Sequence, residues 1–234
     1  TYTGGTLVST GTLVGSTTSL QGDITNNATT EFNQSTNGTY AGIMGGSGSL
    51  VKTGTGEVTL SGANTYTGGT VASGGKLIGT TTSLQGDITD NATIEFNQST
   101  NGTYAGAISG TGAFIKAGTG EVTLSGSNTY TGGSTVSAGK LIGTTTSLQG
   151  AIASSGTIEF DQSTSGTYSG VLSGTGDAIK SGTGTVTFSG TNTYSGDTTL
   201  AAGTLSVGAD SNLGAADLIF TGGTLNVSSG FTTS

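Results

Sequence analysis

The chain has 234 residues, of which 46 are glycine, and it contains no proline, cysteine, histidine or tryptophan. All five basic residues are lysine, against 13 acidic ones, so the net charge of −8 disfavours binding to nucleic acid or to an anionic membrane. Without cysteine there are no disulfides and no thiolate metal site. Without histidine, cysteine and arginine there is also no usual neutral-pH base, thiol nucleophile or bidentate anion clamp.

Short stretches rich in β-branched residues alternate with glycine, asparagine and serine, which is typical of short strands joined by tight turns. Helix is expected nowhere except around Asp210–Asp217. The apolar runs are too short for a transmembrane helix, so no membrane insertion is expected. The chain starts inside a repeat without a basic, apolar leader, so we interpret it as a fragment whose signal peptide has been removed or lies outside the sequence.

A unit of 64 residues recurs without a change of register. Glu57–Gly62 returns as Glu121–Gly126 and as Thr185–Gly190, and residues 1–64 and 65–128 are identical at 47 positions. A unit repeated at a fixed period buries its apolar face on its neighbours, which predicts a solenoid. The predicted parts of one continuous solenoid are repeat 1 (1–64), repeat 2 (65–128), repeat 3 (129–192) and a partial, divergent repeat (193–234).

The predicted strand centres follow in chain order at Leu13, Phe32 and Val51, and the next cycle begins at Leu77. Their spacing predicts about three turns per repeat, each of roughly 20 residues with three short strands, as in a parallel β-helix of about eleven turns. Glycine and asparagine are expected at corners that need positive φ. The core is predicted to be columns of equivalent residues, such as Leu13, Leu77 and Leu141.

Alternation along the strands predicts which side chains face the core. The aromatic residue of each Thr/Ile-Glu-Phe triplet is expected inside, and the acid outside. In the neighbouring strand the aliphatic residue is expected inside and the lysine after it outside. The expected inward residues are Phe32, Phe96, Phe160, Val51, Ile115 and Ile179, and the expected outward lysines are Lys52, Lys116 and Lys180.

Residues 57–77, with the string Glu-Val-Thr-Leu-Ser-Gly-Ala-Asn-Thr-Tyr-Thr-Gly-Gly, resemble the autotransporter-associated β-strand repeat, also called the passenger-associated transport repeat. The stretch 193–231 resembles another recurrent segment of the same passengers. The resemblance implies an all-β, single-stranded, right-handed parallel β-helix. It also implies a passenger segment of a Gram-negative autotransporter (type V secretion), extracellular at the bacterial cell surface, with a C-terminal β-barrel translocator in the full-length chain.

The favoured function is an adhesin or self-association rod that also serves as a stalk, with a host or bacterial surface, or a second rod, as partner. Individually weak contacts along a row of outward neutral side chains would add up between two rods. The candidate adhesive positions are Gln34, Thr36, Asn37, Gln98, Thr100, Asn101, Gln162 and Thr164.

Other polar residues have structural or functional interpretations. A turn asparagine bonded to local backbone is favoured for the Asn-Thr-Tyr motif, and corner packing with an exposed hydroxyl is favoured over a sugar-stacking stripe for the tyrosines. A solvated edge is favoured over calcium binding for the acidic and amide cluster. These residues are Asn64, Asn128, Asn192; Tyr66, Tyr130, Tyr194, Tyr40, Tyr104, Tyr168; and Asp23, Asp87, Asp90, Asn26, Asn27, Asn91.

Two alternatives belong to other classes. A Thr-rich ice- or glycan-binding face is suggested by Thr-x-Thr at Thr53–Thr55 and Thr183–Thr187, although the motif is irregular. A polysaccharide-active enzyme would need paired carboxylates. Since Glu31 and Glu57 recur at the repeat period, and a catalytic site has no reason to be copied, no enzyme activity, cofactor or metal is expected.

Overall fold

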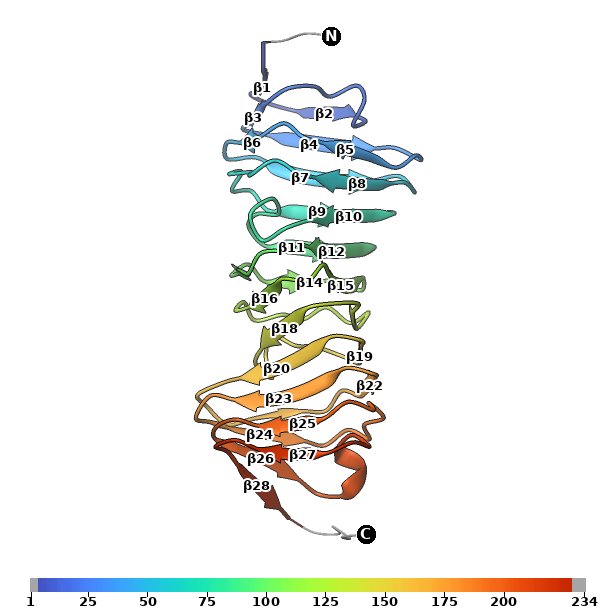
Figure 1. The fold of residues 1–234 in the computed structure, drawn as a ribbon. Helices are drawn as coiled ribbons and strands as arrows, with labels where there is room; N and C mark the ends of the chain where they lie inside the picture. The colour runs from blue at the N-terminus through green and yellow to red at the C-terminus, as the bar shows by residue number, and fades with distance from the viewer. Residues whose placement is uncertain (1–3, 229–234) are drawn as a thin grey trace. The chain divides into compact units, whose positions relative to one another are not determined.

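The computed structural model describes residues 4–228. Within this range the chain forms strands throughout. Its one short 3₁₀ helix, η1 (Asp210–Asn212), lies in the segment Asp210–Asp217, where the sequence predicted that helix could occur. Every strand pair with a defined register is parallel, for example β4 with β7 and β24 with β26 (Figure 1). The predicted all-β fold is confirmed.

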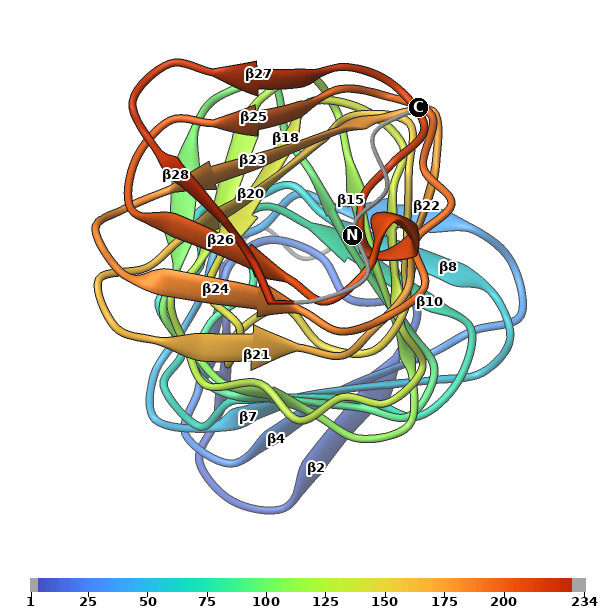
Figure 2. The same ribbon diagram turned by 90° about the horizontal axis from the view of Figure 1, so that it is seen from below.

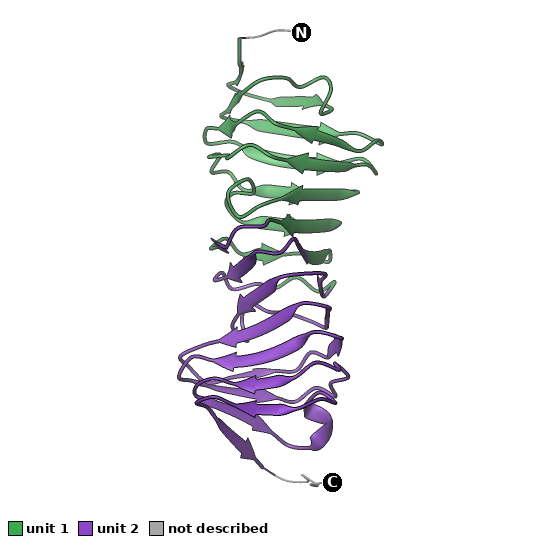
Figure 3. Ribbon diagram, in the orientation of Figure 1, with its two compact units in different colours: residues 1–98, 104–115, 129–132 green, residues 99–103, 116–128, 133–234 purple. Residues whose placement is uncertain are grey.

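Two compact units make up the chain, and they do not follow the 64-residue repeats (Figure 3). Unit 1 comprises residues 1–98, 104–115 and 129–132, and unit 2 comprises residues 99–103, 116–128 and 133–234. Strands β13 (Gly102–Tyr104) and β15 (Ala113–Ala117) have residues in both units.

Unit 1 holds short strands of two to five residues. They are β1 (Thr6–Val8), β2 (Thr12–Gly15), β3 (Ile24–Asn26), β4 (Thr29–Asn33), β5 (Gly38–Tyr40), β6 (Met44–Gly45), β7 (Ser49–Thr53), β8 (Glu57–Leu60), β9 (Thr70–Ala72), β10 (Lys76–Gly79), β11 (Ile88–Asp90), β12 (Thr93–Asn97) and β14 (Ile108–Ser109).

Three parallel sheets arrange these strands in the orders β1-β3-β6, β2-β4-β7-β9-β11-β14 and β5-β8-β10-β12. Paired residues are 17 to 20 positions apart, as in Thr12↔Thr29 and Thr29↔Ser49, so each turn of the solenoid takes that many residues. Figure 1 shows β4, β7, β9 and β11 one below another. The predicted turn length of roughly 20 residues is confirmed.

Unit 2 is built in the same way. Its strands are β16 (Glu121–Leu124), β17 (Ser134–Val136), β18 (Lys140–Gly143), β19 (Ile152–Ser154), β20 (Thr157–Asp161), β21 (Gly166–Tyr168), β22 (Leu172–Gly174), β23 (Asp177–Ser181), β24 (Thr185–Phe188), β25 (Thr198–Leu200), β26 (Thr204–Val207), β27 (Leu218–Phe220) and β28 (Thr224–Val227). Their orders within the parallel sheets are β16-β18-β20-β23-β25-β27, β21-β24-β26-β28 and β17-β19-β22, and Figure 2 shows strands of the first two orders from below.

One repeat is longer than three turns. In unit 1, three turns from Thr12 lead through Thr29 and Ser49 to Gly69, whereas the repeat equivalent of Thr12 is Lys76. The seven extra residues carry the chain round one corner, so a repeat makes about three and a third turns. The prediction of about three turns was close. The extra third of a turn, however, decides on which side of the solenoid the equivalent residue of the next repeat lies.

Equivalent residues therefore lie in different sheets. In unit 1, Leu13 on β2 is paired with Thr30, whereas its copy Leu77 on β10 belongs to another sheet and lies between Val58 and Ile94. In unit 2, Leu141 on β18 and its equivalent Leu205 on β26 are likewise in different sheets. The predicted columns of equivalent core residues are wrong. The extra third of a turn in each repeat, called the fractional turn below, moves the equivalent residue of the next repeat to a different sheet.

The core confirms the inward phenylalanines and corrects the lysines. Phe32 is fully buried and its ring centroid lies 5.1 Å from that of Tyr40. In β7, however, Leu50 and Lys52 are both fully buried and Val51 between them is half-buried. The predicted alternation has the wrong phase in this strand, because the prediction rests on a charged residue facing solvent. Lys116 and Lys180 are buried in the same way.

The corners turn at glycine. Gly54 has φ of 72°, and a Cβ there would lie 2.5 Å from the main-chain oxygen of Gln34 on the preceding turn. Only glycine combines this φ with this close approach. Among the described residues no asparagine has positive φ, so the expectation that asparagine supplies such corners is wrong.

Candidate functional site

A ladder of polar side chains crosses the outside of β8, β10 and β12 in unit 1. Lys76 Nζ lies 3.1 Å from Glu57 Oε1 and 3.2 Å from Glu95 Oε2, which come from the turns on either side. Asn37 Nδ2 donates to Glu57 Oε2 at 3.1 Å, and Asn97 Nδ2 donates to Glu95 Oε1 at 3.1 Å. We call these five residues the first polar ladder.

The second polar ladder, in unit 2, repeats this arrangement on β16, β18 and β20. Lys140 Nζ lies 3.2 Å from Glu121 Oε1 and 3.1 Å from Glu159 Oε2. Asn101 Nδ2 donates to Glu121, and Ser181 Oγ donates to Glu159. In the third copy, also in unit 2, threonines Thr185 and Thr204 replace the acid and the lysine.

The carboxylates keep both ladder lysines charged. Hydrogen bonding to Glu57 raises the pKa of Lys76. Burial lowers the pKa of Lys140, but its pairing with Glu159 and Glu121 outweighs this and raises it. One lysine between two carboxylates leaves each ladder with a net charge of −1. Because Lys76 and Glu57, and likewise Lys140 and Glu121, are partly exposed, these ion pairs stabilise the stack of turns only modestly.

The predicted adhesive positions divide into buried and exposed ones. The expectation that the glutamines point outward is wrong, because all three are buried and serve the corner: Gln34 Oε1 accepts from Thr17 N at 2.7 Å and Nε2 donates to Thr36 O at 2.8 Å. The exposed positions are Thr36, Asn37, Thr100, Asn101 and Thr164, and the buried ones are Gln34, Gln98 and Gln162.

These positions do not form one row. In unit 2, Thr100 precedes β13, which belongs to the sheet of β16 and β18, whereas Thr164 precedes β21, which belongs to the sheet of β24 and β26. The two corners are thus on different sides of the unit. The fractional turn per repeat places the two corners on different sides. The strand spacing in the sequence alone does not show this fraction.

The Asn-Thr-Tyr motif joins successive turns from inside. Asn64 Oδ1 accepts from Met44 N at 2.8 Å and Nδ2 donates to Ser83 O at 2.7 Å, so the side chain bridges the turn before and the turn after. Its partners are 20 and 19 residues away, and the predicted bond to local backbone is wrong. Asn128 and Asn192 are buried equivalents.

The tyrosines are core residues with buried hydroxyls. Tyr66 Oη lies 2.7 Å from Thr70 Oγ1 and accepts from Gln85 N, and burial raises its pKa. Tyr40 Oη donates to Gly22 O at 2.6 Å. All six tyrosines of the two series are at most 3% exposed, so neither a sugar-stacking stripe nor an exposed hydroxyl at the corner is present in them.

Three buried lysines were missed as a structural feature. Lys52 Nζ donates to the main-chain oxygens of Thr53, Gly54 and Gly74, at 2.5, 3.0 and 3.0 Å. Lys116 and Lys180 make equivalent bonds to three carbonyl oxygens each. Burial lowers the pKa of all three. The glycine-rich segment directly after each lysine was the available signal.

The acidic candidates for calcium binding are used in main-chain contacts. Asp23 Oδ1 accepts from Ile43 N at 2.7 Å, Asp87 Oδ1 accepts from Ala107 N at 2.8 Å, and Asp90 is fully buried. Within residues 4–228 no group of three or more acidic side chains is placed to hold a metal ion.

The Thr-x-Thr motifs do not build a flat array. Thr53-Gly54-Thr55 falls at a corner, where Gly54 has positive φ. Thr183 and Gly184 also lie outside strands, and only Thr185 and Thr187 share one strand face on β24.

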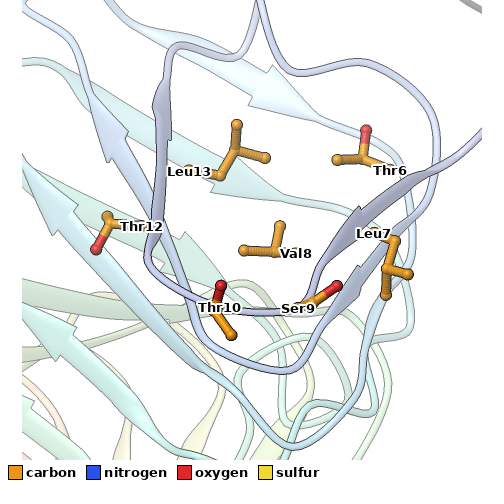
Figure 4. Close-up of a pocket in the computed structure, with 7 residues that line it drawn as sticks. All are labelled: Thr6, Leu7, Val8, Ser9, Thr10, Thr12 and Leu13. Carbon is orange, nitrogen blue, oxygen red and sulfur yellow. The ribbon is translucent and has the colours of Figure 1, made fainter.

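The described surface has open hollows. One of about 350 Å³ lies beside the first described turn, where Val8 and Leu13 point into the turn and Leu7 points away (Figure 4). Its lining is leucine, valine, threonine and serine, with no titratable side chain. Between residues 4 and 228 no helix is long and apolar enough to cross a membrane.

Comparison with known proteins agrees with this geometry. The passenger-associated transport repeat family matches residues 50–78, 114–142 and 179–207, and each match includes a buried lysine near its start and ends in β10, β18 or β26. The chain carries autotransporter passenger repeats. These passenger repeats include the buried asparagine and tyrosine, so the family pattern coincides with the residues that join the turns.

A curated relative supports the same assignment. The chain is 37% identical over 215 residues to the Adhesin BmaC autotransporter of Brucella suis biovar 1 (strain 1330), in an alignment that covers 79% of the chain. The chain spans 6% of the length of that protein. No solved structure matches the chain.

Proposed function

We propose that this chain is part of a surface-displayed autotransporter passenger that acts as an adhesive and self-associating stalk. Parallel stacking of short turns, joined by buried asparagines and lysines, is the observation that carries the proposal. A solenoid of this kind extends by adding turns and holds its surface side chains at fixed spacing. The adhesin name of the relative supports the adhesive role.

The passenger repeats also support a proposal about export and location. We place the full-length protein at the bacterial cell surface of a Gram-negative organism, secreted by the type V route and anchored by a C-terminal β-barrel translocator. A chain without cysteine needs no disulfide formation on its way out of the cell, which suits this route.

Adhesion would be multivalent. Corner threonines Thr36, Thr100 and Thr164 are exposed, and within unit 2 Thr100 and Thr164 lie on different sides. Each contact is weak, but many contacts between long molecules raise the overall affinity. The partner is a host or bacterial surface, including a second copy of the passenger. We propose no catalytic step, since the paired carboxylates Glu57 and Glu95, and likewise Glu121 and Glu159, are each bound to one lysine in the two polar ladders.

The test compares three forms of the full-length protein on the same cells. They are the parent, a form in which residues 1–192 are replaced by an unrelated solenoid of equal length, and a form with Thr36, Thr100 and Thr164 changed to alanine. We expect replacement to reduce cell aggregation or surface attachment, and the triple alanine form to reduce it in part. Equal adhesion by the parent and the replaced form would exclude an adhesive role for residues 1–192 and would leave them only the role of a stalk. Surface labelling of all three controls for display.

A further inference from the structure

Asp90 is an acid in a place where the first repeat has an amide. Its equivalent 64 residues earlier is Asn26, and both side chains are fully buried. In each case one side-chain oxygen accepts a main-chain hydrogen bond: Asn26 Oδ1 from Ala28 N at 3.2 Å, and Asp90 Oδ1 from Ala92 N at 3.0 Å.

The second side-chain atom differs between the two. Asn26 Nδ2 donates to Ser49 O at 2.8 Å. Asp90 Oδ2 occupies the equivalent position, is inaccessible to solvent and has no hydrogen-bond partner. An ionised carboxylate has no hydrogen to donate, so the bond made by the amide in the first repeat is absent.

The surrounding main chain is otherwise the same. Gly48 N donates to Asn26 O at 2.7 Å, and Gly112 N donates to Asp90 O at 2.8 Å. The next residues, Ser49 and Ala113, donate to the equivalent residues Ala28 and Ala92, at 2.9 and 3.1 Å. The carbonyl group of Ala113 is therefore the repeat equivalent of the Ser49 acceptor. All of these second-repeat residues belong to unit 1.

The described elements that flank Asp90 offer it no cation. The strands on either side, β9 and β14, and the segment Gly112–Ala113 carry no titratable side chain. A Cβ at Gly112 would lie 2.3 Å from Asp90 Cγ, so the carboxyl group lies directly against the main chain. Burial raises its pKa to about 6, although the main-chain N–H groups of Ala92 and Ile94 favour the ionised form and act against the rise.

We propose that Asp90 is a proton-operated latch of unit 1. When protonated, Asp90 donates a hydrogen bond to the carbonyl group of Ala113, as Asn26 donates to Ser49. When ionised, Asp90 cannot donate, and the contact between the turn that holds β11 and the turn that holds Ala113 is weaker. The sign follows from proton binding. The folded chain binds a proton that the unfolded chain releases at about pH 4, so stability falls as pH rises from about 4 to 6 and is constant beyond that window.

The function of the latch would be to tighten the passenger in mildly acidic surroundings and to relax one region at neutral pH. The change is confined to the second repeat, because the third repeat has Ser154 at this position, with its hydroxyl donating to Gly156 O at 3.0 Å. One of the three otherwise similar repeats is thus pH-dependent.

The test uses the 234-residue chain and its Asp90→Asn variant, which restores the amide of the first repeat. We expect Asp90→Asn to raise the Tm at pH 7.5 and to leave it nearly unchanged at pH 4.5. An equal or lower Tm of Asp90→Asn at pH 7.5 overturns the proposal. Asp87→Asn, at an exposed acid of the same repeat, is the matched control and should not change the pH dependence.

Two further measurements do not depend on that variant. Asn26→Asp should introduce the same pH dependence into the first repeat. In the parent chain, hydrogen exchange at Gly112 and Ala113, corrected for the intrinsic rate, should be up to about a hundredfold faster at pH 7.5 than at pH 4.5. A carboxyl carbon of Asp90 that titrates by NMR near pH 4 rather than near pH 6 also overturns the latch.

Discussion

The side-chain oxygen of Asn64 accepts a hydrogen bond from the main-chain nitrogen of Met44, 2.8 Å away on the preceding turn. Its amide nitrogen donates to Ser83 on the following turn, so one side chain joins three turns of the solenoid. Both the residue and its partners are buried. At this corner, the side chain of Asn64 makes the hydrogen bonds between turns that main-chain groups make within a sheet.

Asn64→Ala is therefore expected to destabilise the chain strongly. It leaves a buried N–H and a buried C=O without partners, at about 1–3 kcal/mol each. Asn37→Ala is the matched control, since Asn37 bridges two turns in a similar way but is exposed. Urea unfolding should show a loss of about 2–4 kcal/mol for Asn64→Ala and below about 1 kcal/mol for Asn37→Ala. Equal losses would contradict the bridging role.

The lysines provide a second comparison of buried with exposed groups. Lys116→Met removes an ammonium that donates to three carbonyl oxygens, and we expect it to lower the unfolding free energy by about 3 kcal/mol. Lys140→Met removes a partly exposed ion pair and should cost below about 1 kcal/mol. Only the Lys140 effect should shrink in high salt. If the order of the two variants is reversed, the assignment of the buried lysines is wrong.

Alternation along the strands predicted the buried Phe32 and the parallel turns of about 20 residues, because apolar spacing reports directly on burial. The same rule failed at Lys52, where three carbonyl oxygens satisfy a charge inside the corner. It also failed at Gln34, whose amide serves the corner. Such polar partners come from neighbouring turns, and one unit of sequence does not show which turns are neighbours.

The tyrosines predict the behaviour of the chain at high pH. Burial raises the pKa of Tyr66 and Tyr194, so the unfolded chain releases protons that the folded chain keeps, and stability should fall as pH rises above about 10. The buried lysines have lowered pKa values and give the opposite slope below about 10.5, so the measurement belongs between pH 11 and 12.

Absorbance at 295 nm and circular dichroism should then change together, because the buried tyrosines ionise only when the chain unfolds. The chain has no tryptophan to interfere. Ionisation of Tyr66 and Tyr194 in a chain that retains its β-sheet signal would show that their hydroxyls are accessible. Tyr66→Phe should reduce the dependence of stability on pH in this range.

The fractional turn predicts which deletions the solenoid tolerates. Removing residues 65–128 joins equivalent positions of repeats 1 and 3, so every strand meets the type of neighbour it has in the parent chain. Removing residues 65–121 takes away about three whole turns, so the remaining strands stay in the same sheets. The strands that then become neighbours are not equivalent to neighbours in the parent chain, and the buried asparagine and lysine lose their partners. We expect the 64-residue deletion to fold with a parent-like circular dichroism spectrum and cooperative unfolding. The 57-residue deletion should unfold at lower temperature and without cooperativity. If the shorter deletion were the more stable one, whole turns rather than the 64-residue sequence unit would govern which coils can stack.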